Sequence, residues 1–203
     1  MAREKRKADT TEPAQVDLPT SEVVERVLQR EQYRSSFLSG LRSTINALIV
    51  VAAVAVLIAV MILPVIQING SSMTDTLRDG DIVVALTHPR CRTGDVLAFY
   101  YNNNILVKRV IASAGQWVDI DADGNVFVNG QRLEEPYVTE KSLGECDLTL
   151  PYQVPDKKLF VMGDHRATST DSRNSAIGCI DDELVVGRIL LVVWPLANFG
   201  FVQ

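Results

Sequence analysis

One long apolar run dominates the pattern of hydrophobic and polar positions along the chain, from Ala47 to Ile66. It holds about 20 residues without a charge, and a helix that rises about 1.5 Å per residue would carry it across the roughly 30 Å apolar core of a bilayer. A buried core helix of this length would keep polar residues on one face, and a cleaved signal peptide would be shorter and nearer the N-terminus. We therefore expect one permanent transmembrane helix over residues 43–68.

Charged residues on the two sides of this run predict its orientation. The basic residues that precede it are Arg26, Arg30, Arg34 and Arg42. The first basic residue after it is Arg78, which stands among acidic residues. Because Lys and Arg are retained on the cytoplasmic side, we expect residues 1–42 to form a cytoplasmic tail and residues 69–203 to form an extracytoplasmic domain. The tail is polar and is expected to be largely disordered, with a juxtamembrane helix over residues 21–37.

The pattern changes after the apolar run, to short β-branched and aromatic segments separated by Gly, Asn and Asp turns. The predicted strands cover residues 81–86, 95–101, 105–112, 118–121, 126–128, 159–162 and 187–194. Short strands of this kind are typical of antiparallel sheets that curl toward closure. The fold class is therefore predicted to be mainly β, with an antiparallel, partly closed, barrel-like domain behind one N-terminal transmembrane helix.

The composition of this domain argues against some classes of ligand. Residues 69–203 hold 18 acidic and 12 basic residues, which argues against nucleic acid because nucleic acid requires a basic face. The cysteines are Cys91, Cys146 and Cys179, an odd number that allows one disulfide at most and leaves its pairing open. Their spacing does not suit a zinc site. Asp119, Asp121 and Asp123 resemble the start of a calcium loop, but Gly130 stands where such a loop needs its bidentate Glu. We expect no metal and no cofactor.

Two residues suggest nucleophilic chemistry. Ser72 follows the apolar run closely, although a serine in a loop is more often solvated. Lys108 lies within an otherwise apolar strand, with Arg109 directed to the other face. Burial can keep a lysine neutral, which near neutral pH requires its pKa to fall by about three units, or about 4 kcal/mol. The competing interpretation is an edge-strand lysine that prevents aggregation.

A polar loop over residues 162–173 supplies a third element. It follows an apolar strand and is dense in hydroxyl groups and in charges of both signs. Such a loop can orient a lysine through hydroxyl hydrogen bonds and stabilise itself with Asp–Arg pairs. The alternative is an ordinary polar loop without a catalytic role.

Taken together, these segments resemble the type I signal peptidases, the bacterial membrane-bound serine proteases that remove signal peptides from exported proteins. The matching segments, in order, are residues 70–77, 79–84, 106–111 and 163–173. The resemblance implies Ser72 as nucleophile, Lys108 as general base and Ser169 as the hydroxyl that holds the lysine, with Asp171 and Arg173 as a structural pair. It also implies a single-pass protein of the bacterial cell membrane that acts on exported preproteins, and it is compatible with contact to the secretion machinery.

The resemblance also predicts how substrate is held. Shallow apolar pockets should take small residues before the cut, and our predicted wall residues are Ile68, Met73, Leu77 and Val107. The Ser72 backbone N–H should form part of the oxyanion hole. A second donor, a serine in some members, is replaced here by Gly70. Further departures from the usual pattern are Asp75, His165 and Asn174.

Two other functions remain open at this level, and a third class is disfavoured. A specialised maturation peptidase for pilin or conjugation proteins would share the same motifs, so that only its substrates would separate it. A non-enzymatic membrane-anchored binding domain would have no need of Ser72, Lys108 and Ser169. Self-cleaving repressors also use a Ser–Lys dyad, but they are soluble and carry a DNA-binding helix pair, which is not evident before Ser72.

Overall fold

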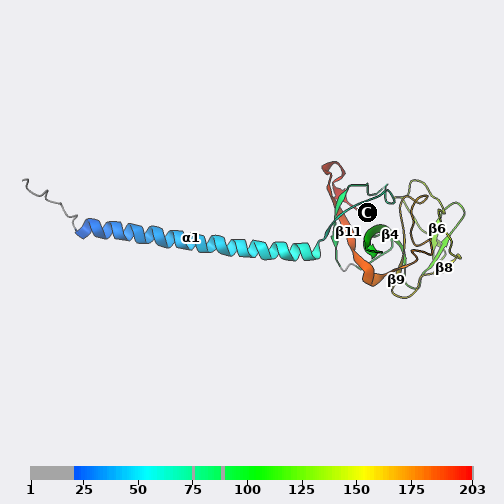
Figure 1. Ribbon diagram of the computed structural model, residues 1–203, viewed down its shortest axis with the longest axis horizontal. Coiled ribbons are helices and arrows are strands. Elements are labelled where there is room, and N and C mark those ends of the chain that lie inside the picture. Colours follow the sequence, from blue (N-terminus) through cyan, green and yellow to red (C-terminus); the bar gives the residue numbers. More distant parts are fainter. Residues whose placement is uncertain (1–20, 75, 88–89, 203) are drawn as a thin grey trace, which may run out of the picture. The chain divides into compact units, whose positions relative to one another are not determined.

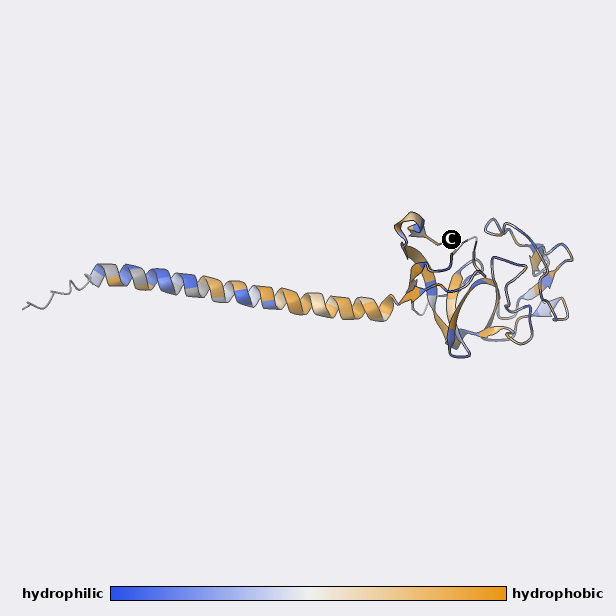
Figure 2. Ribbon diagram, turned by 45° about the horizontal axis from the view of Figure 1, so that its top comes forward, coloured by the Kyte–Doolittle hydropathy of each residue, from blue (hydrophilic) through white to orange (hydrophobic). Residues whose placement is uncertain are grey.

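The first element of the fold is the long helix α1, Ser21–Ile62. The computed structural model describes residues 21–74, 76–87 and 90–202, apart from the side chains of residues 23, 27, 32, 35 and 36. The stretch Phe37–Ile62 of α1 is long and apolar enough to cross a membrane, and Figure 2 shows the change from hydrophilic to hydrophobic along the helix. Residues 1–20 of the predicted tail lie outside the described residues, and residues 21–42 are helical.

The helix ends at Ile62, six residues before the predicted end of the span. Pro64 cannot continue a helix, because it lacks an N–H and its ring clashes with the preceding turn. The last apolar residues instead form strand β1, Val65–Gln67, which pairs with β2, Ile82–Leu86. The Thr87 N–H donates to the Ile62 carbonyl over 3.1 Å, and the Ala85 N–H donates to the Pro64 carbonyl over 2.9 Å. The end of the apolar run therefore belongs to the sheet.

An eight-stranded antiparallel sheet forms the centre of the domain (Figure 1). Its order is β1-β2-β11-β3-β4-β9-β10, and β12 pairs with β11. The further members are β3 Val96–Tyr101, β4 Asn104–Ser113, β9 Lys158–Met162, β10 Ile180–Asp181, β11 Val185–Trp194 and β12 Gly200–Phe201. The domain is mainly β and its sheet is antiparallel, as predicted. Within the described residues, β1 and β10 are the two edge strands of this sheet and do not pair with each other, so that no closed barrel is found.

A second, smaller antiparallel sheet has the order β7-β6-β5-β8. Its strands are β5 Trp117–Ile120, β6 Val126–Val128, β7 Gln131–Arg132 and β8 Tyr152–Gln153. The helical turns η1, Asp182–Leu184, and η2, Leu196–Asn198, flank β11.

The turn between β5 and β6 contains the aspartates that resemble a calcium loop. Asp121 in this turn accepts hydrogen bonds from the side-chain and backbone amides of Asn125, and these bonds lower the pKa of Asp121. The carboxylate therefore shapes the turn.

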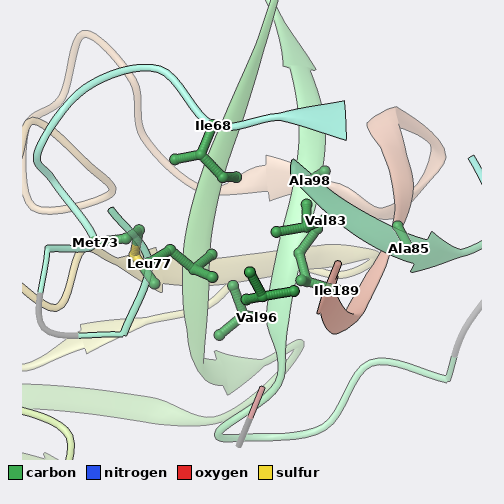
Figure 3. Packing of buried hydrophobic residues seen from close by; sticks show 9 residues of the cluster. Ile68, Met73, Leu77, Val83, Ala85, Val96, Ala98 and Ile189 are labelled. Carbon is green, nitrogen blue, oxygen red and sulfur yellow. The ribbon is translucent and has the colours of Figure 1, made fainter. Parts of the chain in front are cut away.

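One hydrophobic cluster connects the loop around Ser72 to the main sheet. Ile68, Met73 and Leu77 come from this loop and are buried. They pack against strand residues that include Val83, Ala85, Val96, Ala98, Ile189 and Val192. Figure 3 shows Met73 and Leu77 beside the strands that carry Val83 and Val96. Because Met73 directly follows Ser72, burial of its side chain fixes the position of the serine.

Candidate active site

The loop that carries Ser72 is held at both ends by backbone hydrogen bonds. The Ile68 N–H donates to the Asp81 carbonyl over 2.8 Å, and the Gly80 N–H donates to the Ile68 carbonyl over 2.9 Å. Gly70 has a φ of +100°, a conformation that an L-residue adopts only with strain, and its N–H donates to Asp79 Oδ1 over 2.7 Å. The loop thus presents a half-buried Ser72 at a defined turn.

Lys108 lies in the middle of β4, where it pairs with Leu97 of β3. Its side chain is only 4% exposed. Burial is the main cause that lowers the pKa of Lys108, to about 8. The Arg173 charge lowers this pKa further, whereas the carboxylates of Asp171 and Asp164 raise it. With a pKa near 8, part of the amine is neutral near neutral pH and can accept a proton.

Ser72 and Lys108 line the same small groove, which has about 40 Å³ of space. The other residues that line it are Gln67, Ile68, Asn69, Gly70, Met73, Ile105, Leu106 and Val107. Three of the four residues predicted as pocket walls, Ile68, Met73 and Val107, line this groove. Leu77 is the exception, because it is fully buried under the loop and packs into the core. Sequence reasoning missed Ile105, although it alternates with Val107 along the same strand.

The loop after β9 is stabilised by buried ion pairs, as its composition predicts. Asp171 pairs with Arg173, with 2.8 Å between Oδ1 and Nε and 2.8 Å between Oδ2 and Nη2. Asp171 Oδ2 also accepts the Gly163 N–H over 2.9 Å. Arg173 further donates to the carbonyls of Leu143 and Arg166. Because both members of the pair are fully buried, they fix the path of the loop.

This loop brings Ser169 up to the Ser72 segment. The His165 N–H donates to the Ser72 carbonyl over 3.1 Å. A β-carbon on Gly163 would lie 2.2 Å from Ser169 Oγ and 2.5 Å from the Ser72 carbonyl oxygen. Ser169 is 3% exposed, and its hydroxyl has no hydrogen-bond partner among the described residues. The predicted hydrogen bond from Ser169 to Lys108 is therefore not formed in this structure.

Sequence reasoning missed a second group of buried charges. Arg109 pairs with Asp164, with Nη2 and Oδ2 at 2.7 Å, and its guanidinium lies 3.7 Å from the centre of the Tyr137 ring. Arg166 pairs with Glu135 at 2.5 Å. Burial, followed by the Glu135 carboxylate, raises the pKa of Tyr137 to about 12. These contacts join the loop after β7 to the loop after β9, and no local pattern in the sequence could have indicated them.

A larger cavity of about 250 Å³ adjoins the Ser72 loop. The residues that line it are Thr74, Thr139, Glu140, Asp164, His165, Arg166 and Ala167. Thr74 comes two residues after Ser72, and His165 is the residue whose N–H binds the Ser72 carbonyl. The groove and the larger cavity therefore both border the Ser72 loop.

The described residues offer no cluster of three His, Cys, Asp or Glu side chains arranged to hold a metal ion. No disulfide joins Cys91, Cys146 and Cys179 within the described residues. Burial raises the pKa of the Cys91 and Cys179 thiols above the ordinary value. A raised pKa disfavours the thiolate that a cysteine nucleophile requires.

Comparison with known proteins agrees with these features. A family model described as signal peptidase, peptidase S26, matches residues 41–194. Signal peptidase IB of Staphylococcus aureus (strain MRSA252) is 33% identical over 155 residues, which cover 66% of this chain and 79% of that protein. Signal peptidase I of Mycobacterium tuberculosis (strain H37Rv) is 38% identical over 119 residues, 50% of this chain and 40% of that protein.

A solved structure of a signal peptidase I from Enterococcus faecalis V583 is 27% identical, covers 49% of this chain and 97% of that one, and has a TM-score of 0.41. The family match extends over more than half of the chain and includes all four motif segments. The resemblance predicted from the sequence is thereby confirmed. The chain belongs to the signal peptidase family of serine peptidases, peptidase S26.

Proposed function

We propose that this protein is a membrane-anchored endopeptidase that removes signal peptides from exported preproteins, with Ser72 as nucleophile and Lys108 as general base. The observation that carries the proposal is the shared groove, in which a buried lysine with a pKa of about 8 lies beside the serine loop. A lysine in open solvent would be protonated at neutral pH and could not accept a proton.

The reaction begins with proton transfer from Ser72 to neutral Lys108. The serine oxygen attacks the carbonyl carbon of the substrate residue that precedes the scissile bond. The oxyanion of the resulting tetrahedral intermediate accepts a hydrogen bond from the Ser72 N–H. Protonated Lys108 then gives its proton to the leaving amine, which departs with the mature protein. A water activated by the same amine hydrolyses the acyl-enzyme and restores Ser72. The Ser169 hydroxyl, which lacks another partner, would orient the Lys108 amine during these steps.

Two unpaired strand edges support binding of an extended signal peptide. Within the described residues, β1 pairs only with β2, and β4 pairs with β9 only from Arg109 onward. The free edges of β1 and of the first half of β4 border the groove. A peptide that adds to such edges gains backbone hydrogen bonds, while pockets select its side chains. The groove has little free space and is lined in part by Ile68, Met73 and Val107, which favours small apolar residues before the cut.

Anchoring rests on the apolar helix Phe37–Ile62. With the basic residues Arg26, Arg30, Arg34 and Arg42 on the cytoplasmic side, the catalytic domain would lie outside the cell membrane. Protease added to intact spheroplasts should then degrade the domain and spare an epitope tag at the N-terminus. Loss of the tag under the same conditions would contradict this orientation.

The dyad is tested by cleavage of a purified preprotein by the detergent-solubilised chain, with sequencing of the new N-terminus. Ser72→Ala and Lys108→Ala should each abolish cleavage. Ser71→Ala and Lys158→Ala are matched controls, because they change a neighbouring serine and a half-buried lysine that pairs with Asp181. Robust cleavage by either dyad variant would refute the proposed mechanism.

A further inference from the structure

The 250 Å³ cavity beside the Ser72 loop has walls that are already fixed in place. One wall, with Thr139 and Glu140, belongs to the loop after β7. The other, with His165 and Arg166, belongs to the loop after β9. The buried pair of Arg166 with Glu135 joins the two loops. A binding site that is formed in advance loses little conformational entropy when its ligand binds.

The charges around this cavity leave one carboxylate without a counterion. Asp164 is paired with Arg109, and Arg166 is paired with Glu135. Lys141, the basic residue next to Glu140, is directed to Glu135 and to the Asn125 side-chain oxygen. Glu140 is exposed at the cavity and forms no ion pair within the described residues. Glu140 is therefore the carboxylate at the mouth of the cavity that no cation contacts within the described residues.

The cavity and the groove border the same loop, which carries Ser72 and Thr74. Residues before the cut are expected in the small groove, which contains Ser72, Met73 and Lys108. Thr74, two residues after Ser72, is in the wall of the larger cavity. A peptide that occupies the groove and continues past Ser72 therefore meets this cavity with the first residues after the cut.

We propose that this cavity binds the first two residues of the mature protein and that Glu140 favours a basic over an acidic side chain there. This inference rests on the proposed peptidase function and adds a specificity residue to it. Glu140 does not touch the reacting atoms, so that its charge should alter the choice between substrates rather than the chemistry. Because an exposed charge pair is weak and is screened by salt, a two- to fivefold preference at low ionic strength is expected.

The experiment compares kcat/KM for preproteins that differ only in the first or second residue after the cut, which is Lys, Gln or Asp. The full chain in detergent is assayed at pH 8.5, where Lys108 is largely neutral. The wild type should prefer Lys over Gln and Gln over Asp at one of these positions at least. Glu140→Gln should remove the order, Glu140→Lys should reverse it, and 0.5 M salt should weaken it in the wild type.

The control is a second exposed acid away from the cavity, Glu183 in η1. Glu183→Gln and Glu183→Lys change the net charge by the same amounts and should keep the wild-type order. Equal rates for all substrates in the wild type, or the same order in every Glu140 variant, would overturn the inference and leave the proposed function intact. Failure of the wild type to cleave any of the preproteins would refute the proposed function and the inference with it.

Discussion

Gly163 and Ser72 lie so close together that no side chain can fit between them. A β-carbon on Gly163 would lie 2.5 Å from the Ser72 carbonyl oxygen, nearer than β-carbons approach other atoms in real structures. The same β-carbon would lie 2.2 Å from Ser169 Oγ. The glycine at the start of the loop after β9 therefore sets how closely the Ser72 loop and Ser169 approach each other.

We expect Gly163→Ala to lower kcat/KM by about a hundredfold or more, because a displacement of about 1 Å at a catalytic group has an effect of that size. The added methyl group should also destabilise the fold by about 1–3 kcal/mol. Gly200→Ala is the control, since nothing lies within 4 Å of a β-carbon at that position. Full activity of Gly163→Ala would contradict the close packing of the two loops.

Ser169→Ala should separate activity from stability. The Ser169 hydroxyl is buried and has no hydrogen-bond partner among the described residues, and an unsatisfied buried hydroxyl costs about 1–3 kcal/mol. Its removal should leave the free energy of unfolding unchanged or higher, while kcat falls if the hydroxyl orients Lys108. Ser172→Ala is the matched comparison, because Ser172 Oγ accepts the Val161 N–H over 3.0 Å and its loss should destabilise the fold. Normal kcat in Ser169→Ala would exclude the orienting role.

The pH dependence of kcat/KM should report the Lys108 amine. Burial lowers the pKa of Lys108 to about 8, and only the neutral amine can accept the serine proton. The value of kcat/KM should therefore rise about tenfold per pH unit up to about pH 8 and level off above it. A profile that is flat between pH 6.5 and 9, measured with a neutral peptide substrate, would show that Lys108 is not the base.

Burial of Lys108 should also cost stability in a defined pH range. The ordinary pKa of 10.5 applies to the unfolded chain, and the folded value is about 8. The unfolded state binds more protons between these values, so that this cost is full below pH 8 and disappears as the pH rises through 10.5. Lys108→Met should thus be more stable than the wild type at pH 7, by about 3 kcal/mol, and equal to it above pH 11. Urea unfolding of the detergent-solubilised chain measures this difference, and a gain that persists at pH 11 would contradict the linkage.

The longer strands could be predicted from the sequence, because apolar β-branched runs between turn residues specify them locally. β2, β3, β4 and β11 lie within about one or two residues of the predicted ranges. β8, β10 and β12 have two residues each, too few to show alternation. β1 was assigned to the transmembrane helix because Val65 and Ile66 suit a membrane and a strand equally well, and only Pro64 signalled the change.

The same distinction applies to the site. The sequence marks Lys108 as a candidate because it is a charge among apolar neighbours, and it marks Ser72 only through the nearby apolar run and the matching motif segments. Leu77 could not be separated from the groove residues, since its apolar side chain suits a pocket wall as well as a core. The contacts of Arg109 with Tyr137 and of Arg166 with Glu135 join residues about 30 positions apart. Contacts between distant loops depend on the tertiary fold and leave no periodic pattern.

The Glu135–Arg166 pair leads to the last prediction. Both side chains are fully buried, and Arg166 Nε also donates to the Gly163 carbonyl. Glu135→Gln would leave the guanidinium charge buried without its carboxylate, which costs about 3–5 kcal/mol. Because Arg166 holds Gly163, kcat should fall as well. Glu134→Gln, a change at the exposed neighbouring acid, should leave both the urea midpoint and kcat unchanged. If the two variants unfold at the same urea concentration, the pair does not stabilise the junction between the loops.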